Sequence, residues 1–186
     1  MNVTSPPRPA NAAADARVAQ AWTALEAIPD PEIPVVSIRE LGILRGIVVD
    51  ADGMLEVTIT PTYSGCPAMS QIAEDIGHAL DAAGLAPWRL RTVLAPAWTT
   101  DWITPAARER LREFGIAPPG QCGTPAAAQS LRFVPRAARA GAPDRVACPR
   151  CGSVHTQEIS RFASTACKAL YRCLDCREPF DYFKPY

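Results

Sequence analysis

Two short stretches decide the fold of the C-terminal part of this chain: CPRCG at residues 148–152 and CLDC at residues 173–176. Each holds two residues between its cysteines, and 21 residues separate Cys151 from Cys173. A CxxC knuckle lets both sulfurs reach one ion, and two knuckles supply the four thiolates of a tetrahedral zinc site. The spacing therefore predicts a metal site formed by Cys148, Cys151, Cys173 and Cys176. Structural zinc is the leading interpretation, and bound iron or an iron–sulfur cluster is the alternative.

The residues around this clip indicate a small β module. Residues 156–162 and 165–172 look like two strands of a ribbon hairpin, and residues 180–183 look like a third. Such a module is too small to build a large core, and a metal is the expected substitute. We predict a zinc-ribbon-like all-β module, a zinc ribbon with four cysteine ligands, over residues 146–186.

The preceding region, residues 12–116, is predicted to be an α+β domain. Apolar residues recur at helical spacing in some segments and alternate in others. The order helix, strand, strand, helix, strand, helix predicts one sheet with helices packed against it. Residues 117–145 are rich in Pro and Ala and form the predicted linker, with a candidate short strand at 131–134, and residues 1–11 are predicted to be disordered. The expected elements are helices at 12–28, 68–83 and 104–114 and strands at 41–49, 55–60 and 88–94.

Composition indicates a globular protein of a reducing compartment. The chain has 186 residues, of which 48% are hydrophobic and 20% charged, so it can bury a core. Its seven cysteines are an odd number, and four of them sit at metal spacing. The N-terminus carries no export signal and no segment is apolar enough to span a membrane. We expect a cytoplasmic protein without membrane contact.

The charge is unevenly spread along the chain. Residues 1–116 hold 9 Lys/Arg and 14 Asp/Glu, whereas residues 117–186 hold 10 and 5. Such asymmetry indicates either a basic face for an acidic partner or two domains that attract each other. The arginines are scattered singly, without a basic run interleaved with aromatics. We therefore expect a protein partner or self-association rather than nucleic acid.

Two further cysteines are candidates for chemistry. Cys66 follows Ser64-Gly65 at the start of a predicted helix, where the unpaired N–H groups favour a thiolate. Cys167 lies six residues before Cys173, beside Lys168, which could lower the pKa of its thiol or contact an anion. For both cysteines the simpler interpretation is a buried structural residue.

Few groups are available for acid–base catalysis. The chain has two histidines, of which His155 and His78 are both interpreted as surface residues. Asp30 and Glu32 flank Pro31 on a rigid segment, where carboxylates could bind a metal, although a capping or surface role is favoured. No phosphate-binding loop or nucleophile–histidine–acid pattern is present. We therefore predict no catalytic residues and expect a chain that is not an enzyme.

The N-terminal domain resembles the small domain of iron–sulfur assembly proteins such as SufT and its eukaryotic cytosolic-assembly relative. The resemblance rests on DPEIP at 30–34, LGI at 41–43, TYSGCP at 62–67 and PAW at 96–98. The C-terminal FASTACKALYRC at 162–173 and EPFDYFK at 178–184 resemble the PaaD (PaaJ) family of the phenylacetyl-CoA epoxidase, or phenylacetate-CoA oxygenase, system. Together the similarity covers nearly the whole chain from about residue 16. One departure is Ala163, where the family usually has glycine.

The resemblance implies an accessory role in aerobic bacterial phenylacetate degradation. It implies that Cys66, with Cys167, transiently holds iron or an iron–sulfur cluster for the epoxidase, and that the partner is an oxygenase or reductase component of the complex. The alternative is a non-catalytic structural subunit that stays in the oxygenase complex. A homodimer that brings two Cys66 thiols together is a further hypothesis. A nucleic-acid-binding ribbon is disfavoured by the scattered charge.

Overall fold

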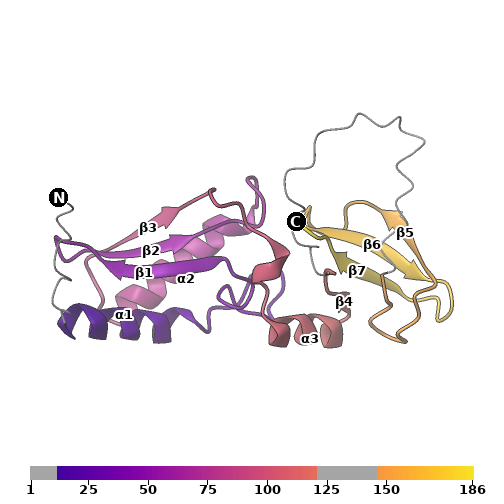
Figure 1. Cartoon of the computed structure of the whole chain (residues 1–186), viewed down its shortest axis with the longest axis horizontal. Helices are drawn as coiled ribbons and strands as arrows, with labels where there is room; N and C mark the ends of the chain where they lie inside the picture. Colours follow the sequence, from indigo (N-terminus) through magenta and orange to yellow (C-terminus); the bar gives the residue numbers. More distant parts are fainter. Residues whose placement is uncertain (1–11, 121–145) are drawn as a thin grey trace, which may run out of the picture.

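The computed structural model describes residues 12–120 and 146–186 (Figure 1). The predicted disorder of residues 1–11, the candidate strand at 131–134 and nearly all of the predicted linker lie outside the described residues, as does Cys122. Figure 1 shows two folded parts side by side, with α3 (Pro105–Phe114) and β4 (Ile116–Ala117) between them.

The N-terminal part is an α+β domain built on a three-stranded sheet. Its order is β1-β2-β3, with β1 and β2 antiparallel and β2 and β3 parallel. The parallel pair is joined by the helix α2, which crosses over between the two strands. The elements are α1 (Ala12–Leu25), β1 (Leu44–Val49), β2 (Leu55–Ile59), α2 (Ala68–Ala82), β3 (Trp88–Thr92), the 3-10 helix η1 (Thr100–Trp102) and α3.

The core of this domain follows the sequence periodicity. In β2 the buried Leu55, Val57 and Ile59 alternate with more exposed residues, as expected for a strand covered on one face. Helices α1 and α2 contact each other and bury Leu25, Ile72, Ile76 and Leu80 in the same cluster. The predicted α+β class is confirmed.

Element bounds differ from the expected ones where backbone chemistry intervenes. Helix α1 ends at Leu25 rather than residue 28. Strand β1 begins at Leu44 rather than residue 41, because Gly42 has a φ of +73° and a Cβ there would lie 2.6 Å from Trp102 Cβ. The chain therefore turns tightly at Gly42 before it can extend. Helix α2 and strand β3 also end earlier, at Ala82 and Thr92.

The C-terminal part is a four-stranded sheet of order β4-β7-β6-β5. Strands β5 (Thr156–Ser160), β6 (Lys168–Cys173) and β7 (Pro179–Phe183) form the expected antiparallel ribbon. Strand β4 follows α3 directly and pairs parallel with β7. The predicted linker at 117–145 thus begins within a strand of the ribbon sheet, while the division of the chain at residues 116 and 146 stays a prediction.

The two parts pack against each other. Cys167 and Phe183 of the ribbon are buried in the same cluster as the core of the N-terminal domain. The ring of Trp98 lies 5.9 Å from that of Phe183, and its indole N–H donates to the Leu41 carbonyl at 2.9 Å. Trp98 is therefore a core residue. Within the described residues, no helix is both long and apolar enough to cross a membrane.

Candidate functional site

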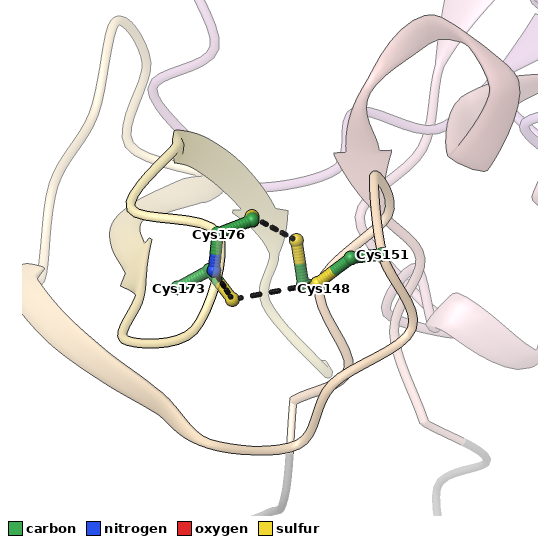
Figure 2. Close-up of side chains that lie close together, drawn as sticks. All are labelled: Cys148, Cys151, Cys173 and Cys176. Carbon is green, nitrogen blue, oxygen red and sulfur yellow. Dashed lines mark hydrogen bonds between the residues drawn. The ribbon is translucent and has the colours of Figure 1, made fainter.

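Four cysteine sulfurs meet at the end of the ribbon (Figure 2). The Sγ atoms of Cys148, Cys151, Cys173 and Cys176 all lie within 4.8 Å of one another. Cys148 Sγ is 3.8 Å from Cys176 Sγ, and Cys151 Sγ is 3.6 Å from Cys173 Sγ. The four cysteines that the spacing selected are thus brought together.

Each knuckle is shaped by its own backbone hydrogen bonds. In the first, the Gly152 N–H donates to the Cys148 carbonyl at 2.9 Å, and Gly152 has a φ of +75°. That conformation suits glycine, which carries no Cβ. In the second, the Cys176 N–H donates to the Cys173 sulfur at 3.4 Å. A tight turn therefore holds the two sulfurs of each knuckle in place.

A polar cross-link joins the two knuckles outside the sulfurs. The carboxylate of Asp175 accepts hydrogen bonds from the Ser153 hydroxyl and from His155 Nδ1, the latter at 3.0 Å. The hydrogen bond from Ser153 makes the largest contribution and that from His155 the next, and together they hold the pKa of Asp175 below its usual range. The Leu174 N–H donates to the His155 carbonyl at 2.8 Å. His155 is exposed, as predicted, and braces the metal-binding loops from outside.

The geometry fits a four-thiolate metal. A Zn–S bond of about 2.3 Å places tetrahedral sulfurs about 3.8 Å apart, close to the two shortest spacings here. Without a metal the clustered thiols share protons: the Cys176 and Asp175 backbone N–H groups lower the pKa of Cys173 to about 7, whereas, despite the Glu178 N–H, burial and the neighbouring cysteines raise that of Cys176 to about 12. Four protein thiolates fill a tetrahedral shell and leave no open position, which is typical of a structural site.

Cys66 lies in the loop before α2, half-buried against the domain core. Burial raises the pKa of its thiol, although the Ala68 N–H and the Thr62 hydroxyl donate to the sulfur and lower it. The expected stabilisation by the helix N-terminus is present but is outweighed by desolvation. The proposed role of Cys66 in metal chemistry therefore stays a prediction.

Cys167 lies directly before β6 and is buried. Its sulfur is 3.0 Å from the Thr165 hydroxyl. Burial raises the pKa of this thiol too, with smaller opposing contributions from Thr165 and Lys168. The predicted effect of Lys168 on Cys167 is thus present, but burial outweighs it.

Cys167 belongs to the core cluster at the junction of the two parts, and Cys66 packs against the same cluster. Ionisation of Cys66 would raise the pKa of Cys167, and the charge of Glu32 raises the pKa of both thiols. Burial raises the pKa of Tyr63, and the nearby acidic groups of Cys66, Cys167 and Tyr186 raise it further. We call these five residues the junction site. Among the described residues, only the four ribbon cysteines place three or more ligand atoms within 4.8 Å of one another, so the junction site is wider.

Buried charges border the junction site. Asp30 is 6% exposed, and its carboxylate accepts from the Glu32 and Ile33 N–H groups at 3.0 and 2.9 Å. Asp30 thus closes a turn rather than capping a helix, because no helix begins in residues 31–36, and the expected surface position is wrong. Burial raises the pKa of Asp30 despite these bonds and nearby Lys168. Lys168 is itself buried and paired with Asp181.

Sequence reasoning missed two aromatic members of the junction site. Tyr63 precedes Cys66 by three residues, and its carbonyl accepts from the Cys66 N–H at 3.2 Å, so its proximity was a usable signal. Tyr186 lies 19 residues after Cys167 in the sequence. Its hydroxyl donates to the Ala166 carbonyl at 3.2 Å. No sequence pattern within a few residues of Tyr186 could have predicted this contact.

Comparisons with known proteins define the class of this chain. Residues 18–85 match the iron–sulfur cluster assembly protein family, and residues 132–184 match the PaaD zinc beta ribbon domain. The second match begins inside the predicted linker. The chain thus combines an iron–sulfur assembly domain with a zinc ribbon. It is also 49% identical, over 90% of its length and 93% of the relative's, to an Escherichia coli protein described as a subunit of a 1,2-phenylacetyl-CoA epoxidase. The chain therefore belongs to the PaaD family of phenylacetyl-CoA epoxidase proteins.

Other relatives match only the first domain. An Fe-S protein maturation auxiliary factor of Porphyromonas gingivalis is 33% identical over 50% of this chain and 85% of that protein. A Bacillus anthracis structure described as a domain of unknown function is 26% identical with a TM-score of 0.50, and covers 55% of this chain and 97% of that one. Both relatives thus cover about half of this chain.

Proposed function

We propose that this chain is a non-catalytic accessory protein of aerobic phenylacetate degradation that helps to assemble or insert the iron or iron–sulfur centre of a phenylacetyl-CoA epoxidase. The observation that carries the proposal is the junction site. Two thiols from different domains, Cys66 and Cys167, belong to or pack against one core cluster there, and the charge of Glu32 raises the pKa of both. Thiolates and carboxylates are among the side chains that bind iron. The iron or cluster is cargo at this site.

The two thiols are suited to transient binding. Burial raises the pKa of both, so each must release a proton when it binds iron. That proton release weakens apparent affinity at neutral pH, which favours handing the cargo on. The wide spacing of the junction site also requires the groups to move together around a single ion.

The ribbon centre has a separate role in this proposal. We assign zinc to Cys148, Cys151, Cys173 and Cys176 because their closed four-thiolate shell suits a structural ion. We propose a cytoplasmic location, and the free thiols of Cys66 and Cys167 support a reducing compartment.

The partner in this proposal is an oxygenase or reductase component of the epoxidase. Support comes from the Escherichia coli relative, which is described as part of that complex. A homodimer that brings two Cys66 thiols together is a further proposal. The same description also favours a second candidate function, a structural subunit that stays in the complex. Stoichiometric co-purification with the oxygenase would support that candidate over a transient factor.

The first experiment compares metal content and epoxidase maturation in wild type and Cys66→Ser. Protein purified without oxygen is analysed for zinc and iron, and epoxidase activity is measured in cells that carry only the variant gene. We expect one zinc per chain in both proteins, with iron and epoxidase maturation lost in Cys66→Ser. Cys122→Ser is the matched control and should behave as wild type. Unchanged maturation in Cys66→Ser would contradict the proposal.

A further inference from the structure

One strand connects the metal centre to the junction site. Strand β6 begins at Lys168, next to Cys167, and ends at Cys173, whose sulfur lies 3.6 Å from that of Cys151. At about 3.4 Å per residue, these two ends lie about 17 Å apart. A strand in a sheet is stiff, so a shift at one end moves the other.

The junction end of the ribbon is tied together by its own backbone. The Lys184 N–H donates to the Cys167 carbonyl at 3.0 Å, and the Tyr186 hydroxyl donates to the Ala166 carbonyl at 3.2 Å. Residues 166–168 and the segment after β7 therefore form one unit. This unit, residues 166–168 with residues 183–186, is called the cap below.

The cap is docked on the N-terminal domain. Trp98 contacts two of its rings, with centroid distances of 5.9 Å to Phe183 and 6.3 Å to Tyr186. The Thr99 hydroxyl donates to the Tyr186 carbonyl at 2.9 Å. Phe183 is 1% exposed and belongs to the core cluster of that domain. The cap thereby brings Cys167 and Tyr186 to the junction site, beside Tyr63 and the Cys66 loop.

Apart from its docking on the N-terminal domain, the ribbon has little to hold it besides its metal. Its own cluster holds seven buried residues among those described, and two of them, Cys148 and Cys173, are metal ligands. A module of this size lacks the apolar core to fold unaided, and metal binding supplies the difference. Losing the metal should therefore loosen β6 and β7, and with them the cap. The buried residues are Ala117, Val146, Cys148, Ala169, Cys173, Phe180 and Tyr182.

We propose that the metal centre formed by Cys148, Cys151, Cys173 and Cys176 positions the cap over Cys66, so that metal at one end of β6 controls solvent access to the thiol at the other. Cys66 is half-buried while the cap is docked. Tyr186 of the cap lines a cavity with Thr62, Tyr63 and Ser64, the residues just before Cys66, so departure of the cap uncovers the Cys66 loop and opens the thiol to solvent. This coupling does not depend on what Cys66 carries, so it can fail or hold independently of the proposed function.

The test measures labelling of Cys66 in the full chain at constant pH. Zinc-loaded protein and protein stripped with a chelator receive a short pulse of iodoacetamide, and Cys66 modification is quantified by peptide mass spectrometry. We expect Cys66 to label at least about tenfold faster without metal, with Cys167 becoming reactive in parallel. Cys66 labelling within about twofold in the two states would overturn the proposal.

A second variant separates undocking from loss of metal. Phe183→Ala removes the ring that contacts Trp98 and leaves the four ligands in place, and Phe114→Ala, at an exposed ring on α3, is the matched control. With zinc bound, we expect Phe183→Ala to label at Cys66 at least about fivefold faster than wild type, and Phe114→Ala to label as wild type does. Hydrogen exchange across β1 and β2 confirms that the N-terminal domain stays folded. Wild-type labelling of Cys66 in zinc-loaded Phe183→Ala would overturn the proposal.

Discussion

The Nζ atom of Lys168 lies 3.2 Å from Oδ2 of Asp181, on the neighbouring strands β6 and β7. The two side chains differ in exposure, at 5% for the lysine and 26% for the aspartate. If Lys168 is removed, Asp181 can turn to water. If Asp181 is removed, Lys168 is left as a buried charge whose remaining electrostatic neighbours are Asp30 and Glu32. Removing Asp181 should therefore cost more stability than removing Lys168.

We predict that Asp181→Asn destabilises the protein more than Lys168→Met. Leaving a buried charge without its partner costs about 3 kcal/mol or more, whereas exposing half of a surface-accessible pair costs about 1 kcal/mol. Urea unfolding of both variants measures the two losses. Equal losses, or a larger loss for Lys168→Met, would show that Lys168 reaches water once its partner is gone.

Trp98→Phe should destabilise the protein by about 1–3 kcal/mol. The substitution keeps an aromatic ring but removes the N–H that donates to the Leu41 carbonyl at 2.9 Å, and leaves that buried oxygen unpaired. Trp88→Phe is the matched control, because its N–H donates to an exposed carboxylate, that of Asp81. We expect a loss of less than about 1 kcal/mol there, because water can replace the lost partner. Urea unfolding distinguishes the two, and equal losses would contradict the role of burial.

Asp30→Asn should stabilise the protein at pH 7. The amide oxygen still accepts from the Glu32 and Ile33 N–H groups, while the buried charge is removed. Because burial raises the pKa of Asp30, the folded state binds this proton more tightly than the unfolded state. The wild type therefore loses stability as the pH rises from about 4, the ordinary pKa of aspartate, through the raised pKa of Asp30 in the folded state. It regains that stability as the pH falls back toward about 4.

Melting temperatures of wild type and Asp30→Asn across this pH range check the sign. The variant should melt higher at pH 7, and the gap should close as the pH falls. A lower melting temperature for the variant at pH 7 would mean that Lys168 and the backbone donors outweigh the desolvation of Asp30. A carboxylate that lowers stability beside Cys66 is consistent with a functional role.

Asp175→Asn should weaken metal binding by about tenfold, within the range for residues that brace ligand loops. Asp175 holds Ser153 and His155 across the two knuckles, and an amide cannot accept from both as a carboxylate does. Competition with a coloured zinc chelator measures the affinity. Asp52→Asn, in the exposed turn between β1 and β2, is the control and should match wild type. Unchanged affinity in Asp175→Asn would show that the knuckles hold their shape without this cross-link.

The sequence predicted the ribbon and the meeting of its four cysteines because both are local. Two residues between cysteines dictate a knuckle, and Gly152 takes the left-handed conformation that the turn requires. The alternation of Leu55, Val57 and Ile59 likewise specified β2 and its buried face. These features depend on neighbours within a few residues, so periodicity and spacing reveal them.

What the sequence could not predict depends on contacts between distant segments. The neighbours of Cys66 include Cys167, about a hundred residues further along the chain, and only the docking of Phe183 on Trp98 brings them together. Burial raises the pKa of both thiols and opposes the local effects of the helix N-terminus at Cys66 and of Lys168 at Cys167. Burial is a tertiary property, and here it outweighs the local effect of the helix N-terminus.

Strand β4 has a consequence for how this chain can be divided. Residues 116–117 leave α3 and pair at once with β7, so the sheet of the ribbon takes one strand from the N-terminal side of the expected linker. A fragment starting at residue 146 would lack that strand. A chain cut between residues 120 and 146 would yield two pieces that each hold part of one sheet, and co-expression should let them reassociate. Any recombination of this ribbon with a different first domain must therefore keep residues 116–117 matched to their own β7.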